Sequence, residues 1–474
     1  MSLVKLVDPV AAEELGRVHF IGIGGSGMSG IARILLKRGV RVSGSDARST
    51  DQVSELRELG AIVHIGHAAS HIRDVDTVVV STAIRDSNPE LGEALKQGLR
   101  IIPRAAALAS VMAGRTGVAV AGTHGKTTTA SMLTVALQKC GADPSYCVGG
   151  QLVTTGLGAD EGSGEVFIAE ADESDGSFLM LAPDIAVVTN VEADHLDNYG
   201  DPRAVHDSFA RFAERVGSLL IVCADDPGAA ELADVARARG LKVITYGETG
   251  DYRVSDVRPD GFGTTFTIGG TIGGTSEGMG EVRLAVPGAH NALNATAVVA
   301  VAVALGLPFE EIRDGLATFT GAKRRFEAKG EAGGVAVFDS YAHHPTELAA
   351  DLRAARDVVA SYSGTGRVIA VFQPHLYSRT RFFADEFGTA LGLADEAIVL
   401  DVYGAREDPE PGVSGALVAG RVRLPASQVV YAPDRASVPA LVAGRARGGD
   451  IVLTMGAGDV TELGPQILAE LSGG

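Results

Sequence analysis

"TGVAVAGTHGKTTTASML", residues 116–133, is the stretch that decides the fold. An apolar run ends in a glycine turn, and a segment of helical composition starts at Lys126. Strand, glycine turn and helix in this order are typical of a parallel α/β unit whose helix start offers free N–H groups to a phosphate. The usual phosphate loop carries glycine where this chain has Val120. The backbone amides of the loop can still surround a phosphate, Lys126 can reach the β- and γ-phosphate oxygens, and Thr127 can bind Mg²⁺. The stretch therefore predicts a triphosphate site.

An earlier glycine loop lies within "HFIGIGGSGMSG", from His19 to Gly30. Gly22, Gly24 and Gly27 have the G-x-G-x-x-G spacing between a predicted strand and a predicted helix, which suits a diphosphate. Asp46 ends the next predicted strand, where it could bind a ribose hydroxyl. Three interpretations stay open on this motif: NAD, a UDP-sugar, or a tight turn without a ligand.

Three polar segments accompany the second loop. "EVFIAEADESD" places four acids after a strand, which suits Mg²⁺ or a solvated loop. "VVTNVEADHLDNYG" has a histidine between acids, which could bind a second metal or a phosphate or make a structural contact. "PGAHNALNATA" puts polar groups on one helix face, where they could bind an adenine edge or cap the helix. The candidates are Glu170, Asp172, Glu173, Asp175, Asn190, Asp194, His195, Asp197, His290, Asn291 and Asn294.

Short Val/Ile-rich runs alternate with Ala/Leu/Arg-rich stretches of helical length along the 474 residues. Continuous apolar runs between helices indicate parallel strands covered on both faces, so the predicted class is α/β, doubly wound, in more than one unit. The length corresponds to about three domains. We expect boundaries near residues 110–115 and 321–323, and exposed strands and turns in the Gly/Thr-rich segment 261–280.

Composition excludes several classes of protein. A net charge of −18 and 5% aromatic residues argue against a nucleic-acid binder. The three cysteines form no paired framework, and we find neither a leader pattern nor an apolar run long enough to span a bilayer. The chain is therefore predicted to be cytoplasmic, without stable membrane association. Its oligomeric state stays open.

The segments "GIGGSGMSG", "GTHGKTTT", "EADESD", "NVEADHLD", "HNALNA", "KRRFE", "DSYAHHPTE" and "FQPHLYSRT" follow one another in this order. As an ordered set they resemble the Mur ligase family, from about residue 17 to residue 460. The shorter G-T-H-G-K-T form, with Val120 before it, is itself similar to the family's loop. The resemblance favours the UDP-sugar interpretation of the first loop.

The resemblance implies three domains: a Rossmann-like UDP-binding domain over residues 1–112, a P-loop-type ATPase domain with a parallel sheet over 113–321, and a Rossmann-like amino-acid domain over 322–474. The implied reaction uses ATP to phosphorylate the lactyl carboxylate of UDP-N-acetylmuramate, and the amine of L-alanine then displaces phosphate. The implied ions are Mg²⁺, or Mn²⁺ in its place. The pathway implied is peptidoglycan precursor synthesis.

The resemblance also assigns roles to residues of this sequence. Lys126, His195, Arg325, Asp339 and His343 are implied to be catalytic, and Thr127, Glu170 and His195 to hold metal. Nucleotide binding is implied for Gly122, Thr123, His124, Gly125, Lys126, Thr127, Thr128, His290, Asn291, Asn294, Arg325 and Asp339. Substrate binding is implied for Gly24, Gly25, Ser26, Gly27, Met28, Asp46, His67, Ser81, Tyr341, His343 and Arg379.

Two departures from the family's pattern bear on these roles. Ser340 stands where the family often has a second aspartate after Asp339, so that acid is either replaced or not needed. No lysine lies between Lys139 and Lys242, which removes the carbamylated lysine of related ligases for later amino acids and fits the alanine-adding member. The alternatives are a related ligase that attaches a whole peptide during wall recycling, an NAD-dependent oxidoreductase, and a non-catalytic nucleotide sensor.

Overall fold

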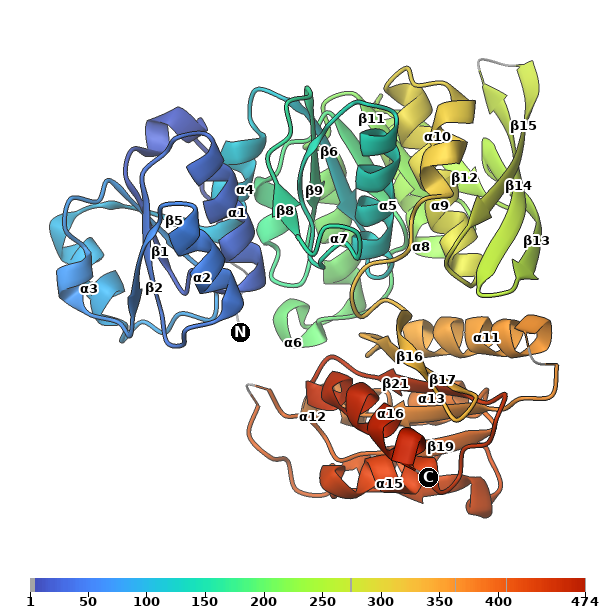
Figure 1. The fold of residues 1–474 in the computed structure, drawn as a ribbon. Helices are drawn as coiled ribbons and strands as arrows, with labels where there is room; N and C mark the ends of the chain where they lie inside the picture. Colours follow the sequence, from blue (N-terminus) through green and yellow to red (C-terminus); the bar gives the residue numbers. More distant parts are fainter. Residues whose placement is uncertain (1–4, 273–274, 363, 406, 474) are drawn as a thin grey trace. The chain divides into compact units, whose positions relative to one another are not determined.

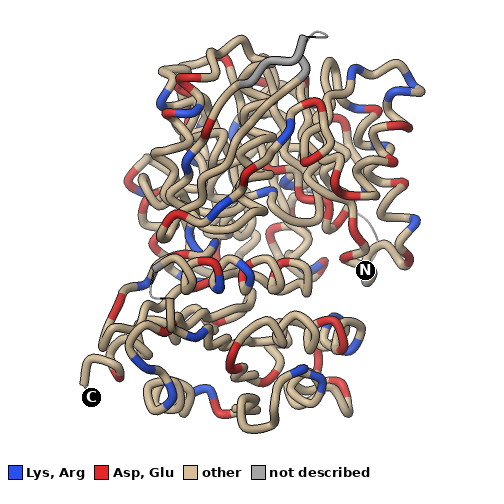
Figure 2. The backbone as a smooth tube through the Cα atoms, turned by 90° about the vertical axis from the view of Figure 1, so that its right-hand side faces the viewer, with Lys and Arg blue, Asp and Glu red and all other residues tan. Residues whose placement is uncertain are grey.

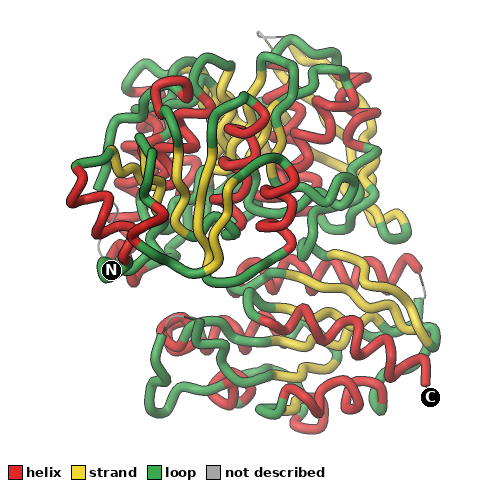
Figure 3. The backbone as a smooth tube through the Cα atoms, turned by 60° about the vertical axis from the view of Figure 1, so that its left-hand side comes forward, coloured by secondary structure: helices red, strands yellow, loops and turns green. Residues whose placement is uncertain are grey.

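The computed structural model describes residues 5–272, 275–362, 364–405 and 407–473. The chain forms two compact units. Unit 1 comprises residues 1–254, 268–279 and 293–316, and unit 2 comprises residues 255–267, 280–292 and 317–474. Figure 1 labels the elements, and Figure 3 shows strands accompanied by helices in each unit.

The N-terminal sheet has five parallel strands in the order β3-β2-β1-β4-β5. Strand β1 lies between β2 and β4, so successive connections leave it in opposite directions and the first glycine loop follows it at this switch point. The strands are β1 Val18–Ile21, β2 Val42–Asp46, β3 Ile62–Ile65, β4 Thr77–Val80 and β5 Arg100–Pro103; the helices are η1 Ala12–Leu15, α1 Ser26–Lys37, α2 Asp51–Glu58, η2 Ala69–His71, α3 Pro89–Gln97 and α4 Arg104–Met112.

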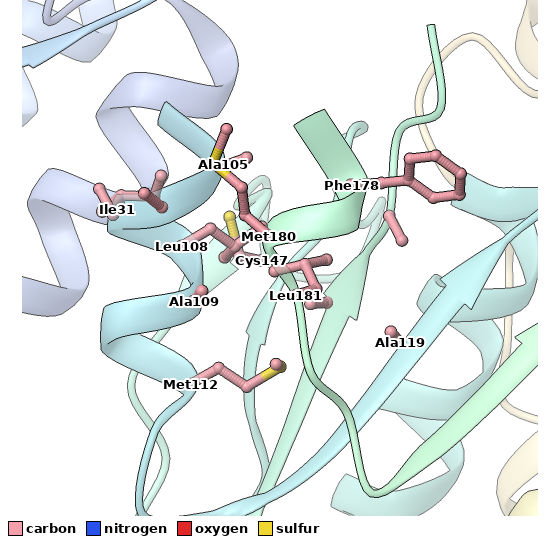
Figure 4. Packing of buried hydrophobic residues seen from close by; sticks show 14 of the residues in the cluster. Ile31, Ala105, Leu108, Ala109, Met112, Ala119, Cys147, Phe178, Met180 and Leu181 are labelled. Atoms are coloured by element: carbon pink, nitrogen blue, oxygen red, sulfur yellow. The ribbon is translucent and has the colours of Figure 1, made fainter. Parts of the chain in front are cut away.

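Helix α4 is buried along most of its length within unit 1. Figure 4 shows Ile31 of α1 on one side of it and Cys147, Met180 and Leu181 on the other. All of these side chains belong to one continuous apolar core. Burial of that many apolar groups fixes α4 in place, and its first residue, Arg104, is held near the first glycine loop.

The central sheet has ten strands among the described residues, in the order β15-β14-β13-β12-β11-β10-β6-β9-β7-β8. Strand β6 is paired in parallel with β10 and β9, and the second glycine loop follows it. The strands are β6 Thr116–Ala121, β7 Ser145–Cys147, β8 Ala159–Asp160, β9 Val166–Glu170, β10 Ile185–Val188, β11 Leu219–Cys223, β12 Lys242–Gly247, β13 Tyr252–Asp260, β14 Gly263–Ile272 and β15 Thr275–Leu284; the helices are α5 Lys126–Lys139, η3 Ser177–Met180, α6 Leu196–Tyr199, α7 Pro202–Ala213, α8 Pro227–Ala238, α9 Ala289–Ala304 and α10 Phe309–Leu316.

The third sheet lies in unit 2, in the order β16-β17-β21-β18-β19-β20, with β16 antiparallel at one edge. Its strands are β16 Glu327–Ala332, β17 Val335–Ser340, β18 Val368–Phe372, β19 Glu396–Val399, β20 Val429–Tyr431 and β21 Ile451–Met455; the helices are α11 Pro345–Tyr362, α12 Tyr377–Phe382, α13 Ala384–Leu391, α14 Gly415–Ala419, η4 Ala426–Gln428, η5 Arg435–Ser437, α15 Val438–Ala443, η6 Asp459–Glu462 and α16 Leu463–Gly473.

The predicted α/β class with parallel sheets is confirmed. In its described residues the segment 261–280 does form strands, but the prediction that it is exposed is wrong for Thr264, Phe266 and Ile268 on one face of β14 and for Thr265 on the other, which are all buried. Residues 273–274 of this segment lie outside the described residues. The domain boundaries stay predictions. Among the described residues, no helix is both long enough and apolar enough to span a bilayer.

Candidate active site

The second glycine loop bends sharply between β6 and α5. Gly122 has φ 128° and Gly125 has φ 81°, both in the region that favours glycine. A Cβ at Gly122 would meet Thr189 Oγ1 at 2.1 Å, so only glycine fits there. Asn190 fixes the loop, because its Oδ1 accepts from the His124 N–H at 2.7 Å and its Nδ2 donates to the His124 carbonyl.

Lys126, the first residue of α5, lies against its own loop. Its Nζ donates to the carbonyls of Gly122 and Thr123 at 2.6 and 3.1 Å and lies 2.8 Å from Glu173 Oε2. Burial alone would lower the pKa of Lys126, but the charges of Glu173 and Asp172 outweigh burial and raise it. The ammonium group therefore stays charged and bound at the turn where a phosphate would bind.

Glu173 is 2% exposed and paired with Lys126. Glu173 is therefore not an open carboxylate of the kind that would bind a metal ion. Thr127 and Glu170 do come together, with Thr127 Oγ1 donating to Glu170 Oε1 at 3.0 Å. The other oxygen of Glu170 accepts from the Gly149 N–H at 2.6 Å. A hydroxyl and a carboxylate at this spacing are hard oxygen donors, so the pair fits Mg²⁺.

His195 lies beside the same group, in a left-handed conformation with φ 53°. Its Nε2 is 3.6 Å from Asp194 Oδ2 and 4.0 Å from Glu173 Oε1. Thr123 links the loop to this segment, since its Oγ1 accepts from the Glu192 N–H at 2.9 Å. The structure thus brings His195 to the acidic cluster; Asp197 lies outside the residues whose side chains are described.

The three polar residues of α9 have different neighbours. Asn294 lies at the second loop, because a Cβ at Gly125 would meet its Oδ1 at 2.9 Å. Asn291 Nδ2 donates to the Pro287 carbonyl at 2.7 Å, as a residue at a helix start does. His290 Nε2 lies 3.9 Å from Asp351 Oδ1 in unit 2. Only Asn294 is therefore shown beside the loop amides.

The first glycine loop ends at Ser26, where α1 begins. Asp46 closes on this loop, since its Oδ2 accepts from the Gly24 N–H at 2.9 Å. That contact uses one loop amide and one oxygen of the acid predicted to bind ribose. The remaining loop residues, Gly25, Ser26, Gly27 and Met28, form the turn and first turn of α1.

Arg104 lies directly against this loop. Its Cδ and Nη1 would be 3.0 and 3.2 Å from a Cβ at Gly27. Arg104 has no hydrogen bond or ion pair with any described residue. Burial alone would raise the pKa of Asp172, but the charges of Lys126 and then of Arg104 help to lower it. A half-buried cation beside a helix start suits an anionic ligand. Sequence reasoning missed Arg104, which is a single arginine at the start of an Ala-rich segment without a motif.

A hollow of about 180 Å³ lies in unit 1 beside the start of α1. Ser26, Ser29 and Arg33 of α1 line it on one side, and Gly149 and Gly150 line it on another. Gly149, which lines the hollow, donates its N–H to Glu170, the partner of Thr127. Figure 2 shows Lys and Arg interspersed with Asp and Glu along the backbone. Binding of an anion in the hollow therefore depends on single nearby Lys or Arg side chains.

His67 and Ser81 lie at the same sheet. His67 Nδ1 is 2.9 Å from Ser45 Oγ, and its neighbour Gly66 donates its N–H to the Asp46 carbonyl. Ser81 follows β4, and its carbonyl accepts from the Ile84 N–H in a turn. Both therefore follow parallel strands at the edge that carries the first loop.

In unit 2, Asp339 is the last residue but one of β17 and is fully buried. Thr454 donates to its Oδ1 at 2.8 Å, Thr461 donates to its Oδ2 at 2.7 Å, and Arg324 Nε lies 3.3 Å away. Both oxygens are engaged within this unit, so the observed contacts of Asp339 are structural. Arg324, which sequence reasoning passed over for Arg325, supplies one of them.

Arg325 instead lies in a second cluster of unit 2. Its guanidinium is 5.2 Å from the Tyr341 ring centroid and 3.8 Å from Glu347 Oε1. His343 joins them, with its ring 5.2 Å from that of Tyr341 and its N–H donating to Glu347 Oε2. Arg379 of α12 is 8% exposed. The structure thus brings together three of the predicted residues, Arg325, Tyr341 and His343.

Ser340 explains its own departure from the family pattern. Its Oγ donates to Asp351 Oδ2 and accepts from the Ala342 N–H at 3.0 Å. An aspartate at this position would place a second buried carboxyl group against Asp351, whose pKa burial already raises, so one of the two would have to stay protonated. Serine instead donates a hydrogen bond to Asp351.

Three family models match the chain: Mur ligase family, catalytic domain, over residues 17–116; Mur ligase middle domain over 120–302; and Mur ligase, glutamate ligase domain, over 324–458. A curated protein from Thermobifida fusca is 61% identical over 99% of this chain and 100% of its own. The chain belongs to the Mur ligase family.

That Mur ligase relative is a UDP-N-acetylmuramate–L-alanine ligase, and one from a Nocardioides species is 55% identical over 98% of each chain. Among solved structures, a UDP-N-acetylmuramate–alanine ligase from Thermotoga maritima matches with a TM-score of 0.79 and 27% identity, over 96% of this chain and 99% of that one. A murein peptide ligase from Psychrobacter arcticus matches with a TM-score of 0.67 at 24% identity, over 96% and 99%, and that likeness shows the Mur ligase fold alone.

Proposed function

We propose that the chain joins L-alanine to the lactyl carboxylate of UDP-N-acetylmuramate, with ATP converted to ADP and phosphate, as a step of peptidoglycan precursor synthesis. The observation that carries this is the 61% identity over the whole chain to a ligase of that name. The geometry supports it, because two separate glycine loops lie at the ends of β1 and β6, and a hollow beside the start of α1 is lined by Gly149, which donates to Glu170.

The chain's residues have distinct tasks in this reaction. Ser26, Gly27 and Arg104 hold the diphosphate half of the sugar nucleotide, which is not broken. The loop amides and Lys126 hold the triphosphate, and the carboxylate oxygen attacks its γ-phosphorus while ADP leaves. Thr127 and Glu170 would hold Mg²⁺, with His195 near a second ion, and bound Mg²⁺ would neutralise phosphate charge. Mn²⁺ offers the same preference for oxygen ligands.

The amine of alanine then attacks the acyl carbon and phosphate leaves with the C–O electron pair. We assign the amino acid to the cluster of Arg325, Tyr341 and His343, with Arg379, because a guanidinium pairs both oxygens of a carboxylate. Asn294 would contact the nucleotide at the second loop, against which it lies. His290 and Asn291 of the same motif stay predicted nucleotide ligands. Asp339 supports Arg324 and the end of β17.

The test is ADP release from the full chain with a panel of amino acids and the tripeptide that a peptide ligase would attach. We expect turnover that requires both UDP-N-acetylmuramate and L-alanine, and the panel measures serine and glycine beside alanine. Equal ADP release without the sugar nucleotide, or a preference for the peptide, would refute the proposal. Lys126→Ala should abolish turnover and leave UDP binding within about twofold, since Lys126 serves the second loop only.

A further inference from the structure

A buried carboxylate lies beside the N-terminal sheet, against Ser45 of β2, whose carbonyl accepts from the Gly22 N–H of the first glycine loop. Glu90, in the first turn of α3, is fully buried and has no Lys or Arg ion-pair partner among the described residues. Its neighbours are His19 of β1, Ser45 of β2, His67 after β3 and His71 of η2. A buried charge needs such donors because water cannot solvate it.

The contacts keep Glu90 ionised. Ser45 Oγ donates to its Oε2 at 2.5 Å, His71 Nδ1 lies 2.6 Å from Oε1, and the Ala68 N–H donates to Oε1 at 3.3 Å. Burial alone would raise the pKa of Glu90, but contacts from His19, Ser45 and His71 outweigh it and lower the pKa to about 2. An ionised carboxylate can only accept hydrogen bonds.

Proton counting then fixes the state of His67. The Ser45 hydroxyl has one proton, which it gives to Glu90. Towards His67 Nδ1, at 2.9 Å, the same oxygen can therefore only accept, so Nδ1 carries the proton. In the neutral ring Nε2 then has the lone pair. His67 is 26% exposed and lies beside Asp46, which holds the first glycine loop at Gly24.

We propose that Glu90 and Ser45 are positioning residues that hold His67 with Nε2 as a hydrogen-bond acceptor for the uridine half of the substrate. This rests on the proposed function. The donors that UDP offers at neutral pH are the uracil N3–H and the ribose hydroxyls, whereas its ionised diphosphate has none. His67 thus reads the nucleoside, and the diphosphate is left to the loop and Arg104.

The first experiment is ¹⁵N NMR of histidine-labelled full-length protein, with His67→Gln to assign the ring. The chemical shifts of the two ring nitrogens separate the tautomers directly. We expect the Nδ1–H form for His67 near pH 8. A predominant Nε2–H form would overturn the proposal, whether or not the protein ligates alanine.

The second experiment measures binding of UDP, CDP, 2′-deoxy-UDP and 3′-deoxy-UDP by calorimetry. CDP lacks the N3–H, so weaker binding of CDP identifies the base as the donor, and weaker binding of a deoxy analogue identifies the ribose. Ser45→Ala and Glu90→Gln should reduce that discrimination about tenfold. Ser110→Ala is the matched control, because its buried hydroxyl donates to the Ala106 carbonyl within α4 and has no described hydrogen bond with Glu90 or its histidines. Ser110→Ala should stay within twofold of wild type.

The discrimination ratio separates positioning from simple loss of structure. Equal weakening of all four nucleotides in both variants, or an unchanged ratio in both, would overturn the proposal. Thermal unfolding of each variant shows whether it has folded. If one variant has not folded, the discrimination ratio of the other variant decides the outcome. Alanine-dependent turnover reports the proposed function independently, so a protein that discriminates nucleotides without ligating alanine would contradict that function alone.

Discussion

Asp351 of α11 should make unit 2 less stable as pH rises. Its side chain is 13% exposed and accepts from Ser340, with Glu347, Arg325 and His290 as its other polar neighbours. Burial is the largest influence and raises the pKa of Asp351 from 3.8 to about 7. Burial also lowers the pKa of His290, so that ring supplies no positive charge near neutrality.

The sign follows from proton binding. Between pH 4 and 7 the folded chain holds a proton on Asp351 that the unfolded chain has lost, so stability falls as pH rises and is constant above pH 7. A shift from 3.8 to about 7 corresponds to about 4 kcal/mol in total, at roughly 1.4 kcal/mol per pH unit. From pH 5 to pH 8.5 the loss should be about 3 kcal/mol.

Asp351→Asn removes this loss, because an amide carries no charge and still accepts from Ser340. The assay is urea unfolding followed by far-UV circular dichroism, since the chain has no tryptophan. The variant-minus-wild-type free energy of unfolding should grow by about 3 kcal/mol from pH 5 to 8.5, since all other titrating groups cancel. Asp357→Asn, an exposed change on the same helix, is the control and should show a much smaller slope. A difference that varies by less than 1 kcal/mol would refute the reasoning.

Two further predictions concern Gly149, which lines the hollow, and Arg104, which lies against the first glycine loop. Gly149→Ala should lower kcat at least tenfold at limiting Mg²⁺, because its Cβ would lie 2.7 Å from Glu170 Oε1. Gly92→Ala is the control, since its Cβ meets nothing within 4 Å, and it should leave kcat unchanged. Equal kcat values in the two variants would contradict the assignment of Thr127 and Glu170 to Mg²⁺. Arg104→Gln should weaken UDP binding about tenfold by calorimetry, whereas Arg41→Gln, exposed beside the opposite end of β2, should change it less than twofold. Equal losses in the two arginine variants would indicate a general charge effect.

Much of the fold could be predicted from the pattern of apolar runs. A run such as that before Gly122 is buried on both faces, and that requirement is local to the run. The predicted exposure of Thr264–Phe266 was wrong. Threonines suggest an exposed segment, whereas the surface that buries these residues comes from elsewhere in the chain. Composition alone does not identify that surface.

The site was predictable where a motif carries its own geometry. Lys126 and Thr127 follow the turn at Gly125 and need no distant partner to be placed. The partners of Lys126 were harder, because Glu173 looked like one of several open acids and its pairing depends on the path of the chain after β9. Arg104 had no motif at all, and its place follows from the burial of α4.

The same pairing determines how ATP should bind. Lys126 is surrounded by the carboxylates of Glu170, Asp172 and Glu173, which keep its pKa raised. An anionic nucleotide entering this cluster meets more negative than positive charge, and repulsion between near charges in a buried site is strong. Mg²⁺ is therefore expected to be needed for ATP binding itself, in addition to the chemical step.

The prediction is that chelation with EDTA weakens ATP binding at least tenfold, measured by calorimetry without the other substrates. Glu173→Gln removes one negative charge and one contact of Lys126, so its ATP affinity should depend less on Mg²⁺ than that of the wild type. Asp175→Asn is the matched control, since its carboxylate accepts only a local N–H from Ser177 among the described contacts. If ATP binds equally well with and without Mg²⁺, the loop amides and Lys126 outweigh the acids, and the acidic cluster acts only after the nucleotide is bound.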